Sequence, residues 1–253
     1  MKKFKFKINH DNGSFNMTVV ANNLESAKNK IGYLPEERGL YRKLTVIDSL
    51  TYLASLKGIT RNIAISRAEQ LLTQINMLPH KNKRVEELSR GMGQLIQFLV
   101  TIIHDPELVI LDEPFAGLDP VNSEILKDII RKLPTQNKVV ILSTHRMNEV
   151  EALCDRILMI NKGCSVLYGK LDEIKSRYRS NSVILELEGE LPHLEGVIGK
   201  QEHKNHIELF LEKNVSPGDI LTQLINNKAK LYRFEVSTPS LNDIFIQVVG
   251  GNQ

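Results

Sequence analysis

The sequence has few cysteines and no long apolar run. Cys154 and Cys164 are the only cysteines among 253 residues, and they form no CxxC or Cys/His ligand pattern. This usage excludes a disulfide framework, argues against a structural metal site and fits a reducing cytosol. The apolar run LIQFLVTII is interrupted by Gln97 and is far shorter than the roughly 20 residues of a membrane-spanning helix. The N-terminal MKKFKFKINHDNG lacks the apolar segment of a signal peptide. We therefore expect no bilayer-spanning segment.

The chain also lacks a strong excess of charge of either sign. Its 33 basic and 30 acidic residues give a formal net charge of +3. Nucleic acids and anionic membranes select proteins with a strongly basic surface. We therefore expect neither as the main partner. The length suits one larger domain joined to a small one.

Apolar periodicity predicts an α/β fold for most of the chain. The first 22 residues alternate apolar and polar around HDNG, which predicts a hairpin. Residues 45–104 carry helical spacing and predict an inserted helical segment, whose last helix begins at Ser89. The stretches LVILD and KVVILS predict buried strands, each followed by a helix. Strands alternating with helices indicate a layered domain with a largely parallel sheet.

A change of composition near Ser176 predicts a second domain. The stretch KSRYRSNS is polar and basic, and shorter strand and helix patterns follow it, ending in a helix from Pro239. We assign residues 1–175 to the α/β domain and residues 176–253 to a small α+β accessory domain.

The stretch LVILDEPFAGLDP carries the clearest chemistry. An apolar strand runs into Asp112 and Glu113, and Asp119 follows a Gly-Leu pair. A Mg²⁺-bound triphosphate needs one carboxylate for the metal and another group to orient the attacking water. Adjacent residues at a strand end project to different sides, so they can divide these tasks. Two solvated acids at a strand end are the structural alternative for Asp112 and Glu113.

Four further features bear on this choice, and each has a structural alternative. Ser89 and Gly91 open a helix whose free N–H groups favour an anion, although Ser89 is also an ordinary N-cap. Asp119 suits a helix cap equally well. His145 follows the strand VVILS, where an imidazole can contact a phosphate or a water, although a lone histidine is usually structural. Glu36 lies in a loop where it can simply be solvated.

In order along the chain, IGYLPEERGLY, LSRGM, LVILDEP, AGLD and STH resemble the Q-loop, signature, Walker B, D-loop and switch-histidine motifs of ABC transporter ATP-binding subunits. The resemblance covers residues 31–169. It implies ATP and Mg²⁺ as cofactors, a membrane-spanning permease as partner, a second nucleotide-binding subunit in a homo- or heterodimer, and a cytoplasmic location on the inner face of the membrane.

The resemblance also implies roles for the residues at the matching positions. Asp112 becomes the magnesium residue, Glu113 the general base and His145 the phosphate sensor. Glu36 becomes a further magnesium contact. Residues that cross to the nucleotide of the opposite subunit complete the set: Ser89, Gly91 and Asp119.

The sequence departs from the family pattern in its motifs. The signature is LSRGM where the family most often has LSGGQ, and Glu36 stands where the Q-loop has glutamine. Both changes resemble an exporter-like branch with a C-terminal extension ending in PSL-x-x-IF, here Pro239 to Phe245.

No stretch of the sequence reads GxxxxGK[ST], the phosphate loop. The segment NHDNGSFNMTVVANNLESAKNKIGYLP resembles what the family carries after that loop, so the chain resembles a member cut at its front. We therefore expect weak binding of ATP by the chain alone. Three hypotheses follow: an ATP-hydrolysing transporter subunit, a binding-deficient partner that lends its signature motif to another subunit's site, and a truncated remnant.

Overall fold

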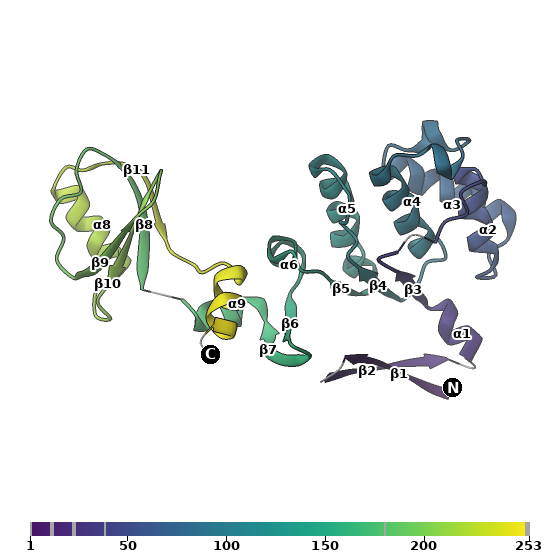
Figure 1. The fold of residues 1–253 in the computed structure, drawn as a ribbon, viewed down its shortest axis with the longest axis horizontal. Helices are drawn as coiled ribbons and strands as arrows, with labels where there is room; N and C mark the ends of the chain where they lie inside the picture. Colours follow the sequence, from purple (N-terminus) through teal and green to yellow (C-terminus); the bar gives the residue numbers. More distant parts are fainter. Residues whose placement is uncertain (1, 11–12, 22–23, 38, 180, 251–253) are drawn as a thin grey trace. The chain divides into compact units, whose positions relative to one another are not determined.

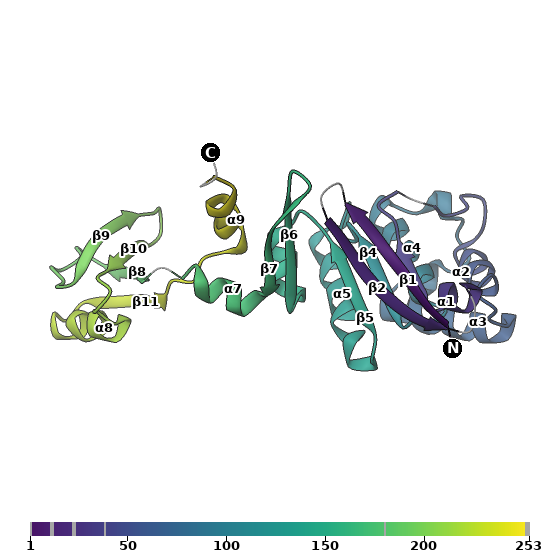
Figure 2. The same ribbon diagram turned by 90° about the horizontal axis from the view of Figure 1, so that it is seen from below.

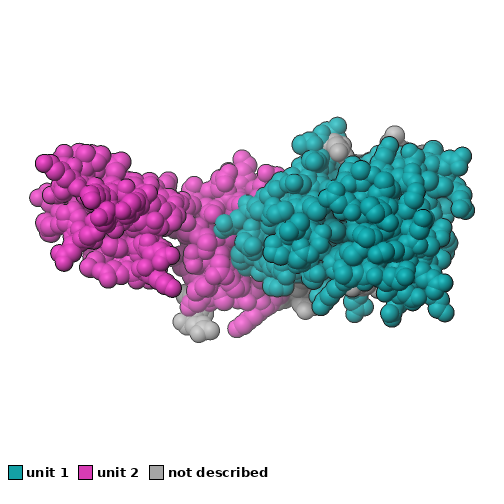
Figure 3. Space-filling view, turned by 90° about the horizontal axis from the view of Figure 1, so that it is seen from above, with its two compact units in different colours: residues 1–153 teal, residues 154–253 magenta. Residues whose placement is uncertain are grey.

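The computed structural model describes residues 2–10, 13–21, 24–37, 39–179 and 181–250. The chain divides into two compact units, residues 1–153 and 154–253 (Figure 3). This division lies before the predicted boundary at 175/176. The strands β6 (Arg156–Asn161) and β7 (Cys164–Lys170) lie in the second unit and form a separate two-stranded antiparallel sheet. The predicted linker is also partly helical, because α7 (Leu171–Arg177) runs into it.

The first unit contains the predicted parallel sheet. Its described strands are β3 (Ile31–Leu34), β4 (Leu108–Asp112) and β5 (Val139–Ser143), in the order β3-β4-β5. The central strand β4 is largely buried, as predicted. The prediction that β5 is buried is wrong: Val139 is 59% exposed and no residue of the strand is buried. Among the described strands β5 pairs only with β4, so it has a neighbour on one side alone.

The predicted helical segment is confirmed (Figure 1). It contains α2 (Val46–Ser55), α3 (Arg61–Gln74) and α4 (Arg90–Ile102), with short 3₁₀ turns at Leu78–His80 and Val85–Glu87. Thr45 and Ser89 cap α2 and α4 through their side-chain oxygens. The three helices pack around one apolar core with the sheet, and its fully buried members include Leu50, Leu72 and Phe98.

The remaining elements of the first unit agree with the sequence pattern, with one exception. The predicted hairpin is formed by β1 (Lys2–His10) and β2 (Gly13–Ala21), and positions 11 and 12 of its turn lie outside the described residues. Helices α5 (Pro120–Lys132) and α6 (Met147–Leu153) follow β4 and β5, and a 3₁₀ turn lies at Pro134–Gln136. The exception is α1 (Leu24–Asn29), which the periodicity did not indicate.

The second unit holds the small α+β fold (Figure 2). Its four-stranded antiparallel sheet has the order β11-β8-β10-β9, with bounds β8 Ser182–Glu188, β9 Val197–Glu202, β10 Ile207–Leu211 and β11 Lys230–Val236. The helices that follow α7 in this unit are α8 (Pro217–Asn226) and α9 (Leu241–Gly250). Leu185, Leu209 and Ile220 form the core between the sheet and α8. The sequence pattern did not indicate β9. Among the helices of the described residues, none has the length and apolar character needed to cross a membrane.

Candidate functional site

Glu113 occupies a sharp turn at the end of β4. Its φ is +43°, in the left-handed region that residues with a Cβ rarely adopt. Its backbone N–H donates to the carbonyl of Ser143 over 2.9 Å, which holds the turn against the end of β5. Strain of this kind persists only where surrounding contacts fix it, and it concentrates at functional positions.

The carboxylate of Glu113 accepts hydrogen bonds from the segment that follows β5. Oε1 lies 2.9 Å from the backbone nitrogen of His145 and 2.7 Å from its Nδ1, and Oε2 accepts from Thr144 Oγ1 over 3.1 Å. The Glu113 side chain is 16% exposed, whereas that of His145 is 82% exposed. The structure therefore joins two of the predicted site residues directly, and it leaves most of the imidazole open to solvent.

Asp112 lies beside the same strand end. It is paired in register with Ser143, whose hydroxyl donates a hydrogen bond to Asp112 Oδ1. Mg²⁺ prefers oxygen ligands and usually takes one or two carboxylates together with water and phosphate oxygens. A half-exposed carboxylate fits that preference. Among the described residues no group of three or more His, Cys, Asp or Glu forms a metal cluster.

Glu36 lies apart from this hydrogen-bond network. It is exposed in the loop after β3, and no hydrogen bond within the described parts of the chain joins it to Asp112 or Glu113. The side chain of Gln97 in α4 donates hydrogen bonds to the backbone of this loop. The sequence pattern did not indicate a role for Gln97.

The signature and D-loop residues form a second cluster. Ser89 Oγ accepts from the backbone nitrogen of Met92 over 3.2 Å and caps α4. Gly91 is buried, and a Cβ at this position would lie 3.5 Å from the carbonyl oxygen of Gly117. The start of α4 therefore packs against the AGLD loop.

Asp119 is the N-cap of α5. Its Oδ1 accepts from the backbone nitrogen of Asn122 over 3.0 Å and its Oδ2 accepts from the Asn122 side chain over 2.5 Å. These hydrogen bonds lower the pKa of the Asp119 carboxyl, because they favour its charged form. Asp119 is therefore a structural cap in this chain, which leaves its exposed carboxylate fixed in direction.

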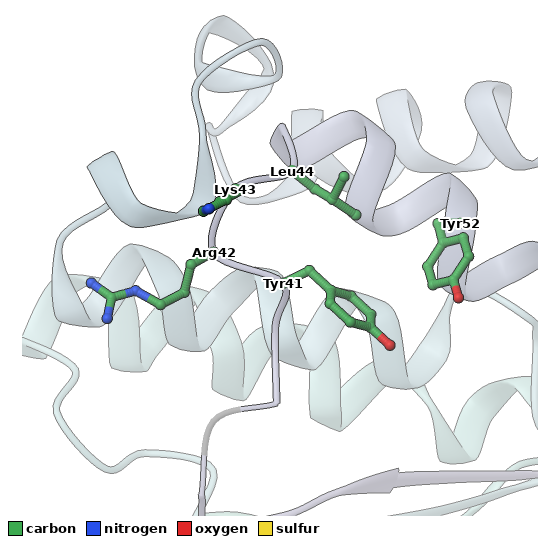
Figure 4. Close-up of a pocket in the computed structure, with 5 residues that line it drawn as sticks. All are labelled: Tyr41, Arg42, Lys43, Leu44 and Tyr52. Atoms are coloured by element: carbon green, nitrogen blue, oxygen red, sulfur yellow. The ribbon is translucent and has the colours of Figure 1, made fainter.

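A hollow of about 480 Å³ opens between the loop after β3 and α2 (Figure 4). It is lined by Tyr41, Arg42, Lys43, Leu44 and Tyr52. The rings of Tyr41 and Tyr52 meet edge to face with centroids 5.6 Å apart, and both are about half exposed. Aromatic side chains and arginine are enriched at protein interfaces.

Comparisons with known proteins agree with this geometry. A family model described as "ABC transporter" matches residues 5–116, and a model for the C-terminal domain of DrrA1-3-like ATP-binding proteins matches residues 169–249. An uncharacterized ABC transporter ATP-binding protein of Bacillus subtilis strain 168, YhaQ, is 43% identical over 225 residues, which cover 88% of this chain and 75% of that protein. The chain belongs to the ATP-binding proteins of ABC transporters.

Other members of the family are similar over different shares of the chain. The linearmycin resistance ATP-binding protein LnrL of B. subtilis strain 168 is 29% identical and covers 95% of this chain and 82% of its own. NatA of the same strain is 36% identical over 62% of this chain and 64% of its own. A solved ATP-binding subunit of an ABC transporter matches with a TM-score of 0.56 and 27% identity, covering 61% of this chain and 64% of that chain.

These findings confirm the family resemblance and the fold class predicted from the motifs. The chain is an ABC transporter ATP-binding subunit with a DrrA-like C-terminal domain. The hypothesis of a binding-deficient partner or remnant is not favoured, because the family to which the chain belongs is that of ABC transporter ATP-binding proteins.

Proposed function

We propose that this subunit hydrolyses Mg-ATP, with Glu113 as the general base and His145 as the contact to the terminal phosphate. The observation that carries the proposal is the 2.7 Å contact between His145 Nδ1 and Glu113 Oε1. Ionised carboxylates only accept hydrogen bonds, so Nδ1 carries the proton in this contact. Nε2 is then the ring atom left for a substrate, on a side chain that is mostly exposed. It accepts from a water in the neutral ring, and it donates to a phosphate oxygen when both ring nitrogens carry a proton.

Glu113 is well prepared to orient a water. One backbone N–H, the imidazole Nδ1 of His145 and one hydroxyl hold its carboxylate in place, so little rearrangement is needed when a proton is taken up. Asp112 would hold the magnesium ion, with Glu36 as a second oxygen ligand from the loop after β3. A bound magnesium ion neutralises charge on the phosphate oxygens.

A second nucleotide-binding subunit completes the proposed site. The start of α4 presents Ser89 and Gly91 beside the loop that holds Asp119, and helix N-termini favour anions. In this proposal these three residues act on the nucleotide of the opposite subunit, in either a homo- or a heterodimer.

The permease partner is proposed to dock on the helical segment, at the inner face of the membrane. The hollow lined by Tyr41 and Tyr52 supports this placement, because it lies directly after the Glu36 loop and combines aromatic rings with two cations. A photoreactive side chain at position 52 should cross-link to the permease in the assembled transporter. Exclusive cross-linking elsewhere would contradict this placement.

The function is tested by Glu113→Gln in the assembled transporter. Loss of a general base should reduce ATP hydrolysis by roughly two orders of magnitude or more, while ATP binding persists. Glu107→Gln is the matched control, because Glu107 precedes the same strand and forms an exposed ion pair with Lys30. Hydrolysis that Glu113→Gln leaves unchanged would remove Glu113 from the base role.

A further inference from the structure

One side of α4 carries polar residues that take no part in the roles proposed above. Gln94 and Gln97 lie about one turn apart and both are buried. Gln94 Nε2 donates to the carbonyl of Pro114 over 3.1 Å, next to Glu113. The helix that begins with the signature residues is therefore tied to the turn that holds the proposed base.

Gln97 makes the corresponding contact with the Glu36 loop. Its Nε2 donates to the carbonyl of Pro35 over 3.3 Å and to the carbonyl of Glu37 over 3.0 Å. The amide orientation is fixed, because two carbonyl oxygens need a donor and only the NH₂ group supplies one. The backbone is thus held on both sides of Glu36, while the Glu36 side chain stays exposed.

Burying the Gln97 amide costs free energy, which indicates that this side chain does more than fill space in the core. Gln97 Oε1 is buried and has no hydrogen-bond partner among the described residues. An aliphatic side chain would fill the same space without an unsatisfied acceptor. A second contact holds α4 against the strand that precedes the loop. Thr101 Oγ1, one turn further along α4, lies 3.4 Å from the carbonyl oxygen of Tyr33 in β3.

We propose that Gln97 is a positioning residue for Glu36. Its amide sets where the loop presents the Glu36 carboxylate, and it links that position to α4 and hence to Ser89 at the start of the same helix. The inference rests on the proposed metal role of Glu36 for its functional meaning. The physical contact can be tested without nucleotide.

The test is the mobility of a nitroxide spin label at position 37 in the full chain. Glu37→Cys supplies the attachment site, in a background in which Cys154 and Cys164 are replaced by alanine and serine. The parent should give an immobilised component in its spectrum. Gln97→Met is nearly isosteric and cannot donate, so that component should be lost. Gln94→Met is the matched control and should leave it in place, because Gln94 contacts Pro114 instead.

A pH readout separates donation from packing. In Gln97→Glu, a charged carboxylate faces two carbonyl oxygens at about pH 8, whereas the acid protonated near pH 5 can donate one hydrogen bond. The immobilised component should therefore return on acidification in Gln97→Glu but not in Gln97→Met.

Two results would overturn the proposal. One is a label that stays immobilised in Gln97→Met. The other is that Gln97→Met mobilises a reference label at the exposed Gln70 of α3 as much as the label at position 37, because the variant would then loosen the whole unit. Failure of the proposed metal role of Glu36 gives a different result. Glu36→Ala would then leave the Mg²⁺ dependence of ATP hydrolysis in the assembled transporter unchanged, while the spin label at position 37 would still be mobilised by Gln97→Met.

Discussion

Lys127 of α5 and Glu149 of α6 form a buried ion pair. Nζ lies 2.8 Å from Oε2, and the side chains are 11% and 6% exposed. Nζ also lies 6.0 Å from the centroid of the Phe115 ring. Burial alone would lower the pKa of Lys127, but the hydrogen bond with Glu124 and the ion pair with Glu149 outweigh it and raise the pKa. The pair joins the helix capped by Asp119 to the helix that follows His145.

Removal of one member of this pair should strongly destabilise the first unit. Glu149→Ala leaves a buried cation with the exposed Glu124 as its remaining carboxylate partner among the described residues, and we expect a loss of about 3 kcal/mol in the free energy of unfolding. Glu124→Ala is the control: Glu124 contacts the same Nζ at 2.8 Å but is 62% exposed, so its loss should cost under about 1 kcal/mol. Urea unfolding followed by circular dichroism measures both. Equal losses of unfolding free energy in the two variants would show that the burial of Glu149 does not make its ion pair stronger than that of the exposed Glu124.

His104 should make stability depend on pH. Burial is the main cause that lowers its pKa to about 4, with Lys57 and Lys138 acting in the same direction and the carbonyl of Ile31 and Asp105 opposing. The unfolded chain takes up this proton near pH 6.5, whereas the folded chain does not until about pH 4. This contribution to stability is therefore complete above the unfolded pKa and is lost as pH falls from about 6.5 to about 4.

The His104 prediction is checked by urea midpoints across that pH range. His104→Gln cannot titrate, so its stability should fall less steeply with acidification than that of the parent. His193→Gln, which changes an exposed histidine, should keep the parent's slope. Parallel curves for the parent and His104→Gln would refute the role of His104.

The order of motifs along the chain was enough to predict the family, and the strand and helix patterns predicted where Asp112 and Ser89 lie. The contact between Glu113 and His145 was not predictable, because it depends on the left-handed turn at Glu113 and on β5 being the neighbour of β4. Gln97 was missed because its partners lie about 60 residues away in sequence. A signal was present in the polar residues spaced 3, 4 and 3 apart: Gln94, Gln97, Thr101 and His104.

Limited trypsin digestion should cut the chain first in the stretch KSRYRSNS. Arg177 and Arg179 are exposed there, at the end of α7 and just before β8. Cleavage needs several residues to unfold locally, which a short connecting segment does more readily than packed helices or a paired strand. Mass spectrometry of early fragments identifies the site, and Arg177→Gln with Arg179→Gln should slow this cut selectively. First cleavage within 46–102 or 183–236 would contradict the predicted boundary.

The close approach of β3 to α4 predicts that Gly32 tolerates no side chain. A Cβ at Gly32 would overlap the carbonyl oxygen of Thr101 and would lie 3.1 Å from Pro106 Cγ. Because the oxygen belongs to the backbone, rotation of a side chain cannot relieve the overlap, and Gly32→Ala should cost about 3 kcal/mol of unfolding free energy. Gly39→Ala is the control from the same segment, because no described residue other than its chain neighbours lies within 4 Å of its added Cβ, and its cost should be under about 0.5 kcal/mol. Thr101→Ala should not rescue Gly32→Ala, since it leaves the carbonyl in place. Rescue by Thr101→Ala, or equal urea midpoints for the two glycine variants, would show that β3 and α4 are not held together as closely as the structure indicates.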